Sequence, residues 1–146
     1  TVLKPGLKKC FEELDYAFRD LENNHYDYVI VVDTLTLKIE TILRFMCEKL
    51  GIATFKTRNK GGEKLVMEKL LDDMLSDLQD TPQIPTGFSE ADRLMLKYTL
   101  TPKGHNLRNR VAHGLMDLWE YSFTDVVILL YLIIKLSTYK FTSHIN

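Results

Sequence analysis

Apolar residues recur every three or four positions along most of the chain, and this spacing restricts the fold more than any other feature. Residues 7–21 illustrate it, with a stripe formed by Leu7, Phe11, Leu14, Phe18 and Leu21. Alternation of apolar and polar residues, the mark of half-buried strands, is nearly absent. The sequence therefore predicts an all-α fold, a bundle of five or six helices.

Turn residues divide this helical pattern. One long helix is predicted over about 28–50, closed by Gly51, and it carries Glu40 and Arg44 four positions apart, where the two side chains can pair along the surface. The stretch FKTRNKGGE, residues 55–63, is interpreted as a loop, because Gly61 and Gly62 permit conformations that other residues avoid.

Four more helices are predicted in the rest of the chain. A helix over about 63–78 ends at the prolines of DTPQIPTG, residues 80–87. Ser89 and Asp92 predict the start of a short helix that ends near residues 101–102. Two more helices are predicted: one is capped by Asn106 and continues to about Leu115, and the other starts at Thr124 or Asp125. The last helix is apolar nearly all round, which places it centrally in its bundle or at a contact with another subunit.

Length and composition fit one globular domain, residues 1–146. The chain has 146 residues, of which 45% are hydrophobic and 27% charged, with a net charge of −1. This charge argues against a surface built as a whole for nucleic acid, so a polyanion would have to bind at a local patch. The chain begins with Thr1 and not with Met, from which we expect a domain excised from a longer protein or a trimmed product.

Cysteine usage and hydropathy indicate a compartment. Cys10 and Cys47 lie in helical apolar patterns without the spacing of metal ligands, so we expect buried free thiols in a reducing compartment. The longest apolar run, residues 126–134, is shorter than the ~20 residues that a bilayer crossing requires. A soluble, cytoplasmic protein without a membrane partner is therefore expected.

The stretch HNLRNRVAHGL, residues 105–115, concentrates groups that bind phosphate and transfer protons. At about 100° per residue, its apolar positions form one stripe that faces the core. That stripe contains Leu107, Val111, Leu115 and Leu118. Asn109 and His113 lie one above the other on the opposite side, with Arg108 and Arg110 on the flanks. The histidine is thus predicted to point outward, with the Asn109 amide placed to orient it.

These residue types suit the cleavage of RNA. A histidine takes or gives a proton near neutral pH, and an arginine holds phosphate oxygens with paired hydrogen bonds. Asn109 can orient the imidazole or hold a ribose hydroxyl. RNA carries its own nucleophile, the 2′-hydroxyl, so we expect neither a metal nor another cofactor. The alternative is a solvated helix flank, because Arg and His are common on exposed helix faces.

The string RNRVAHG, with the pattern Arg-Asn-x-x-x-His-Gly, resembles the motif of the HEPN superfamily, and most closely that of a bacterial family of uncharacterised C-terminal domains. The resemblance extends more weakly to a long second helix with Glu40 and Arg44 and to a final hydrophobic helix. It implies a HEPN-like helical bundle in which Arg108, Asn109 and His113 are the catalytic residues.

The resemblance also implies an activity. HEPN ribonucleases are typically metal-independent, cut RNA by attack of the 2′-hydroxyl, and dimerise so that two motifs face one cleft. Many act as toxins, phage-defence effectors or RNA-processing enzymes, which makes RNA, a second copy of the chain, an antitoxin or a missing N-terminal region the expected partners. Other members are non-catalytic modules that dimerise and bind a nucleotide, RNA or a protein. A helical accessory domain is a third interpretation.

Helix geometry gives an independent reason to expect a homodimer. Arg108 and His113 are about 140° apart around the helix axis, too far for both to reach one phosphate easily from a single helix. Two helices related by a two-fold axis would remove this difficulty.

Residues around the motif are weaker candidates. Arg110, His105 and Lys103 could add RNA contacts, although a polar turn also explains His105 and Lys103. The basic stretch between Lys56 and Lys64 is interpreted as a solvated loop, with contact to the RNA backbone as the alternative. Three aromatic residues are predicted to pack rather than to stack on bases: Trp119, Tyr121 and Phe123.

Overall fold

The computed structural model describes residues 8–9, 11–12, 15, 28–79 and 88–140. The described elements are α2 (Val29–Lys49), β1 (Phe55–Lys60), β2 (Glu63–Glu68), α3 (Leu71–Gln79), α4 (Glu90–Leu100), α5 (Leu107–Ala112), the 3-10 helix η1 (Leu118–Glu120) and α6 (Phe123–Thr138). Residues 8–9, 11–12 and 15 are helical, as the periodicity predicts. Phe11 is exposed, and the rest of that stripe lies outside the described residues.

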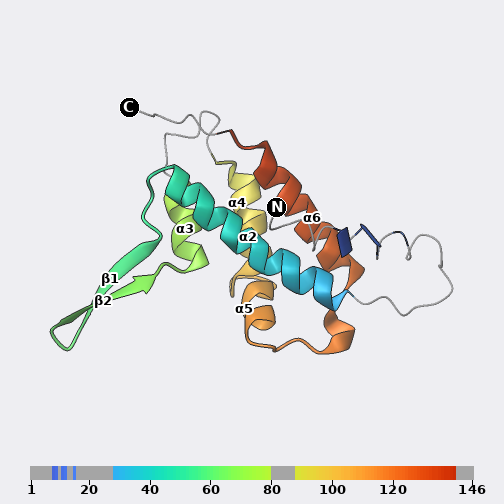
Figure 1. Cartoon of the computed structure of the whole chain (residues 1–146), viewed down its shortest axis with the longest axis horizontal. Helices are drawn as coiled ribbons and strands as arrows, with labels where there is room; N and C mark the ends of the chain where they lie inside the picture. The colour runs from blue at the N-terminus through green and yellow to red at the C-terminus, as the bar shows by residue number, and fades with distance from the viewer. Residues whose placement is uncertain (1–7, 10, 13–14, 16–27, 80–87, 141–146) are drawn as a thin grey trace.

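The long helix α2 packs against α3, α5 and α6 (Figure 1), and α4 packs against the same three helices. One face of α2 is fully buried, and it meets α6 most extensively and also α3 and α5. The core joins apolar side chains from each of the helices α2 to α6. Its largest fully buried members are Leu35, Ile39, Leu43, Met46, Met74, Leu75, Leu78, Leu96, Leu100, Leu107, Leu129 and Leu132.

The predicted boundaries of α2 and α4 are confirmed. Gly51 has φ +72 and follows the last turn of α2, where its N–H donates to the Glu48 carbonyl and the Ile52 N–H donates to the Cys47 carbonyl. This is the Schellman arrangement, in which a left-handed glycine lets the chain satisfy the last carbonyls of a helix. At the start of α4 the Ser89 hydroxyl accepts a hydrogen bond from the Asp92 N–H, as the capping pattern predicts.

The prediction of an all-α fold is wrong, because residues 55–68 form a two-stranded antiparallel sheet. This hairpin projects from the helices (Figure 1). It replaces both the loop predicted over 55–63 and the first part of the helix predicted over 63–78, so that α3 begins only at Leu71.

The reason for the hairpin lies in its turn. Gly61 and Gly62 have φ +61 and +89 and connect two strands of equal length, with Lys60 opposite Glu63. A two-residue turn with both φ values positive matches the twist of the strands it joins, and two glycines adopt it at no steric cost. The same pair would weaken a helix by about 1 kcal/mol per glycine.

The last helix begins at Phe123, slightly before the predicted position. Ser122 and Asp125 form a reciprocal capping box there, in which each side chain accepts from the backbone N–H of the other. α6 is not central in the bundle, because one side is buried in the core while Val127, Tyr131 and Ile134 are exposed. It therefore presents a second apolar side to the outside.

Two further observations concern the sequence expectations. Cys47 is a buried free thiol, as predicted, and burial raises its pKa to about 11; Cys10 lies outside the described residues. Among the helices of the described ranges, none has both the length and the apolar composition needed to cross a lipid bilayer.

Candidate functional site

The motif helix α5 is shorter than predicted. It ends at Ala112 rather than near Leu115, because Gly114 adopts φ +61 and the chain reverses. The Gly114 N–H donates to the Val111 carbonyl and the Leu115 N–H donates to the Arg110 carbonyl, the same Schellman arrangement that ends α2. The glycine of the motif therefore places the preceding histidine at the end of the helix.

This early end changes the predicted core stripe. Leu107 is fully buried and Val111 packs against the core, as predicted. Leu115 and Leu118 are 64% and 77% exposed, so their assignment to the stripe is wrong: they lie beyond the helix, where helical spacing no longer applies. Trp119, predicted to pack, is 82% exposed.

The two other aromatic residues do pack in part. The Tyr121 hydroxyl donates to Asp33 at 3.1 Å, and the Phe123 ring lies 6.2 Å from that of Tyr28 between centroids. Burial raises the pKa of Asp33 even though the Tyr121 hydrogen bond opposes the change.

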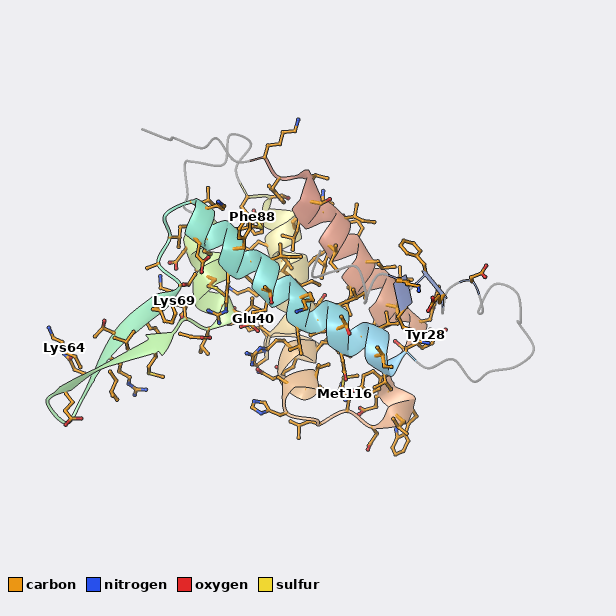
Figure 2. All side chains as sticks on the ribbon, viewed as in Figure 1. Tyr28, Glu40, Lys64, Lys69, Phe88 and Met116 are labelled. Atoms are coloured by element: carbon orange, nitrogen blue, oxygen red, sulfur yellow. The ribbon has the colours of Figure 1, made fainter. Side chains whose placement is uncertain are left out.

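Arg108 is held by a buried carboxylate on α2. Its Nε donates to Glu40 Oε2 at 2.6 Å, and one Nη contacts Glu40 Oε1 at 3.5 Å. Glu40 also accepts from Arg44 at 2.8 Å, so the predicted pair of Glu40 with Arg44 is confirmed, although Glu40 is 8% exposed and not a surface residue. In Figure 2, Glu40 lies on the side of α2 toward α5.

The electrostatics of Glu40 follow from these contacts. Burial alone would raise the pKa of the Glu40 carboxyl, but the hydrogen bonds and charges of Arg108 and Arg44 outweigh it and lower the pKa below its usual value. Glu40 is thus a carboxylate at neutral pH, and it fixes two guanidinium groups at one place.

Asn109 extends this network. Its side-chain oxygen accepts from Arg108 Nη1 at 3.2 Å, and its Nδ2 donates to the side-chain oxygen of Asn106 at 2.9 Å. Asn106 precedes α5 in the left-handed conformation, with φ 57, and its side chain does not cap the helix. The hydrogen bonds of the Asn109 amide are therefore made with Arg108 and Asn106 and not with His113.

A pocket of about 240 Å³ opens beside these groups. Its polar wall includes Glu40, Arg44, Arg108 and Asn109. The remaining lining residues come from the end of the hairpin, the start of α3 and the end of α4: Glu68, Lys69, Leu70, Leu71, Asp72, Leu100, Thr101 and Pro102. His113 does not line it.

Arg44 connects the pocket to the hairpin. Its guanidinium donates to the Lys69 carbonyl at 3.1 Å and lies 3.2 Å from the Glu68 carboxylate at the end of β2. Figure 2 shows Lys69 at the base of the hairpin and Lys64 at its far end. The hairpin and α5 are thus linked through one cluster of ion pairs centred on the buried Glu40.

His113 is exposed, as predicted, and it is the C-cap residue of α5. Its backbone N–H donates to the Asn109 carbonyl. Within the described ranges its imidazole has neither a hydrogen bond nor an ion pair. The structure therefore brings Arg108 and Asn109 together and leaves the third motif side chain open to an external partner.

The weaker candidates each have an acidic neighbour. Arg110 pairs with Glu120, and His105 Nε2 lies 3.0 Å from Asp125 Oδ1. Lys103 lies 3.4 Å from Asp72, which also approaches Lys97 at 3.4 Å. Of the seven residues in these pairs, only Asp72 lines the pocket.

Sequence reasoning missed the role of Glu40 as the partner of Arg108. A signal was present, because Glu40 falls in the buried stripe of α2, four residues after Thr36 and beside Ile39. A carboxylate on an apolar helix face must find a cation, since an unpaired buried charge is costly. The contributions of Glu68 and Asp72 depend on the hairpin and had no comparable signal.

Within the described part of the chain, no three His, Cys, Asp or Glu side chains come together in a way that could hold a metal ion. No protein-family model, curated protein or solved structure matches the chain.

Proposed function

We propose that this chain is a HEPN-type endoribonuclease that acts in the cytoplasm without a metal and cleaves RNA by attack of the substrate's 2′-hydroxyl. Arg108 binds the phosphate and the charge that develops on it, Asn109 positions Arg108, and His113 transfers the proton. The reacting groups come from two copies of the chain.

The observation that carries the proposal is the way Arg108 is held. A guanidinium has five N–H groups, and Arg108 uses three of them on Glu40 and Asn109. Two remain for an anion at the pocket, and the planar group is already oriented by its buried partner. Preorganised donors of this kind stabilise developing charge without reorganisation during the reaction.

The proposed step uses only groups of the substrate and the protein. His113 takes the proton of the 2′-hydroxyl, whose oxygen forms a bond to phosphorus. The bond from phosphorus to the 5′-oxygen breaks, and an imidazolium returns a proton to that oxygen. The products are a 2′,3′-cyclic phosphate and a 5′-hydroxyl.

Two observations support a composite site. Arg108 lines the pocket while His113 stands outside it at the exposed end of α5. Leu115, Leu118 and Trp119, which follow His113, form an exposed apolar stretch of the kind that marks an interface. A second copy docked there would bring its own His113 toward the Arg108 pocket.

The central test is cleavage of single-stranded RNA in the presence of chelator, with analysis of the 3′ ends. We expect cyclic phosphate ends, and His113→Ala should lower the rate about a hundred-fold or more. Full activity of this variant, or a strict need for a divalent ion, would contradict the proposal.

Lysine variants of two arginines test whether activity depends on the planar guanidinium of Arg108 or only on its positive charge. Arg108→Lys keeps the charge but loses the fork that Glu40 and a phosphate share, so it should lose most activity. Arg110→Lys should have little effect, because Arg110 pairs with Glu120 away from the pocket. Equal losses would mean that the patch only attracts RNA.

The composite site is tested by mixing subunits. If one Arg108 and one His113 from opposite chains suffice, a mixture of Arg108→Ala and His113→Ala protein should regain activity after the protomers exchange. If both pairs are required, the mixture stays inactive but the protein must still be dimeric. A monomer with full activity would exclude the composite site.

A non-catalytic binding module is the second candidate. The observation in its favour is that the cations around the motif are already paired, Arg108 with Glu40 and Arg110 with Glu120. Such a module would bind RNA without producing cyclic phosphate ends, so the same assay distinguishes the two.

A further inference from the structure

The hairpin and the residue that follows it have a local excess of positive charge. Residues 55–69 contain five cations and two carboxylates, whereas the whole chain has a net charge of −1. At the base of the hairpin, Lys56 pairs with Asp73. Among the described residues, Arg58 and Lys64 have no ion-pair partner, and both are exposed. The projecting part of the hairpin is therefore a local site for a polyanion.

The strand register assigns the side chains of the hairpin to two faces. Residues directly opposite each other in an antiparallel pair point to the same side, and successive residues alternate. The register pairs Phe55 with Glu68, Thr57 with Val66 and Asn59 with Lys64. We call these six residues the Phe55 face. The other side, the Leu65 face, contains Lys56, Arg58, Leu65 and Met67.

The Phe55 face, unlike the Leu65 face, leads to the pocket. At the base of the Phe55 face, Glu68 contacts Arg44 and lines the pocket that contains Arg108. Opposite Glu68, at the same base, the face exposes the Phe55 ring, which is 54% accessible, and toward the tip the face ends with Lys64. An aromatic ring, polar side chains and a cation thus follow one another from the pocket outward.

We propose that the Phe55 face binds single-stranded RNA and guides the strand into the pocket at Arg108. The inference rests on the proposed function and adds its substrate class, an unpaired strand. Lys64 contacts a backbone phosphate, and a base stacks on Phe55. A projecting aromatic ring can stack only on a base that is not already stacked in a duplex.

Binding is measured with a labelled single-stranded 2′-O-methyl RNA of mixed sequence by fluorescence anisotropy. This RNA lacks the 2′-hydroxyl nucleophile and cannot be cleaved by the proposed reaction. The binding result is therefore independent of catalysis. If ordinary RNA is not cleaved, the proposed function is refuted, but the binding assay still tests whether the hairpin binds a single strand.

The first comparison removes one cation from each face. Lys64→Gln should reduce the slope of log affinity against log salt by about 0.7, the value for one phosphate contact on a single strand. Arg58→Gln, on the opposite face of the same ribbon, should leave the slope unchanged. Equal reductions would overturn the assignment to one face.

The second comparison concerns stacking. Phe55→Ala should weaken binding by at least about five-fold, Phe55→Tyr should retain it, and Leu65→Ala on the other face should not change it. Thermal unfolding of each variant checks that the hairpin variants remain folded. An unchanged affinity for Phe55→Ala would overturn the proposal. So would a changed oligomeric state with unchanged affinity, which would make the hairpin a protein interface.

Discussion

Replacing Glu40 with glutamine tests whether one buried carboxylate holds the candidate site together. The carboxylate accepts short hydrogen bonds from Arg108 Nε at 2.6 Å and from Arg44 at 2.8 Å. The amide keeps one acceptor, adds a donor that faces two guanidinium groups, and carries no charge. We therefore expect Glu40→Gln to lower the free energy of unfolding and to displace Arg108.

The magnitude follows from these two bonds. A hydrogen bond to a charged group contributes about 1.5–3 kcal/mol, which gives an upper range of about 3–6 kcal/mol for the pair. The side chains of Arg44 and Arg108 are 22% and 32% exposed, so water replaces part of the hydrogen bonding that they lose. We expect a net loss of about 2 kcal/mol near neutral pH.

Urea denaturation followed by circular dichroism measures this loss, and its pH dependence identifies the cause. The folded-state pKa of Glu40 is lowered from 4.5, so the carboxylate contributes stability above that value and loses it as the pH falls through the folded pKa. Glutamine does not titrate. The difference between wild type and Glu40→Gln should therefore shrink in acid, whereas Glu48→Gln, at an exposed position of the same helix, should be nearly neutral throughout. If the difference in unfolding free energy between wild type and Glu40→Gln were the same in acid as at neutral pH, the reasoning would be refuted.

Three other substitutions test separate parts of the structure. Gly114→Ala should lower the melting temperature by about 2–4 °C in a calorimetric scan, because a left-handed alanine costs about 1 kcal/mol; an unchanged melting temperature would contradict this. Tyr139→Phe removes a 2.7 Å hydrogen bond to the buried Asp92, and urea denaturation should show a loss of about 1–2 kcal/mol, whereas equal midpoints would argue against it. In a Cys10→Ser variant, Cys47, whose pKa burial raises to about 11, should react with a thiol reagent only after unfolding, and rapid reaction of the folded protein would exclude that.

The sequence predicted those helices whose signals are local. A stripe of apolar residues closed by Gly51 was enough to define α2, and the Ser89 cap was enough to start α4. The hairpin was missed because Val66 and Met67 also fit the helical spacing that continues through Leu70, Leu71 and Met74 into α3. Periodicity alone does not show where a helix begins. The turn at the two glycines favours a hairpin, so the residues that follow it form a strand instead of the start of the helix.

Only the motif residues of the candidate site were predictable from the sequence, and their contacts were not. Arg108 and Asn109 were identified from the motif, and the outward position of His113 is confirmed. Glu40 lies 68 residues before Arg108, so their contact depends on how α5 packs against α2. Tertiary packing of this kind leaves only an indirect trace in one sequence, a carboxylate within an apolar stripe.

The extensive contact between α2 and α6 has a consequence for how the protein is made. All of β1, β2, α3, α4 and α5 lie between these helices in the chain. On a ribosome that adds about 5–20 residues per second, α2 waits on the order of ten seconds for its main partner. During that time the apolar stripe of α2 that contains Leu35, Ile39 and Leu43 lacks α6, the helix with which α2 makes its most extensive contact. Synthesis of α6 is therefore the step that covers this stripe, and a chain that stops before Phe123 would leave the stripe open to chaperones and to aggregation.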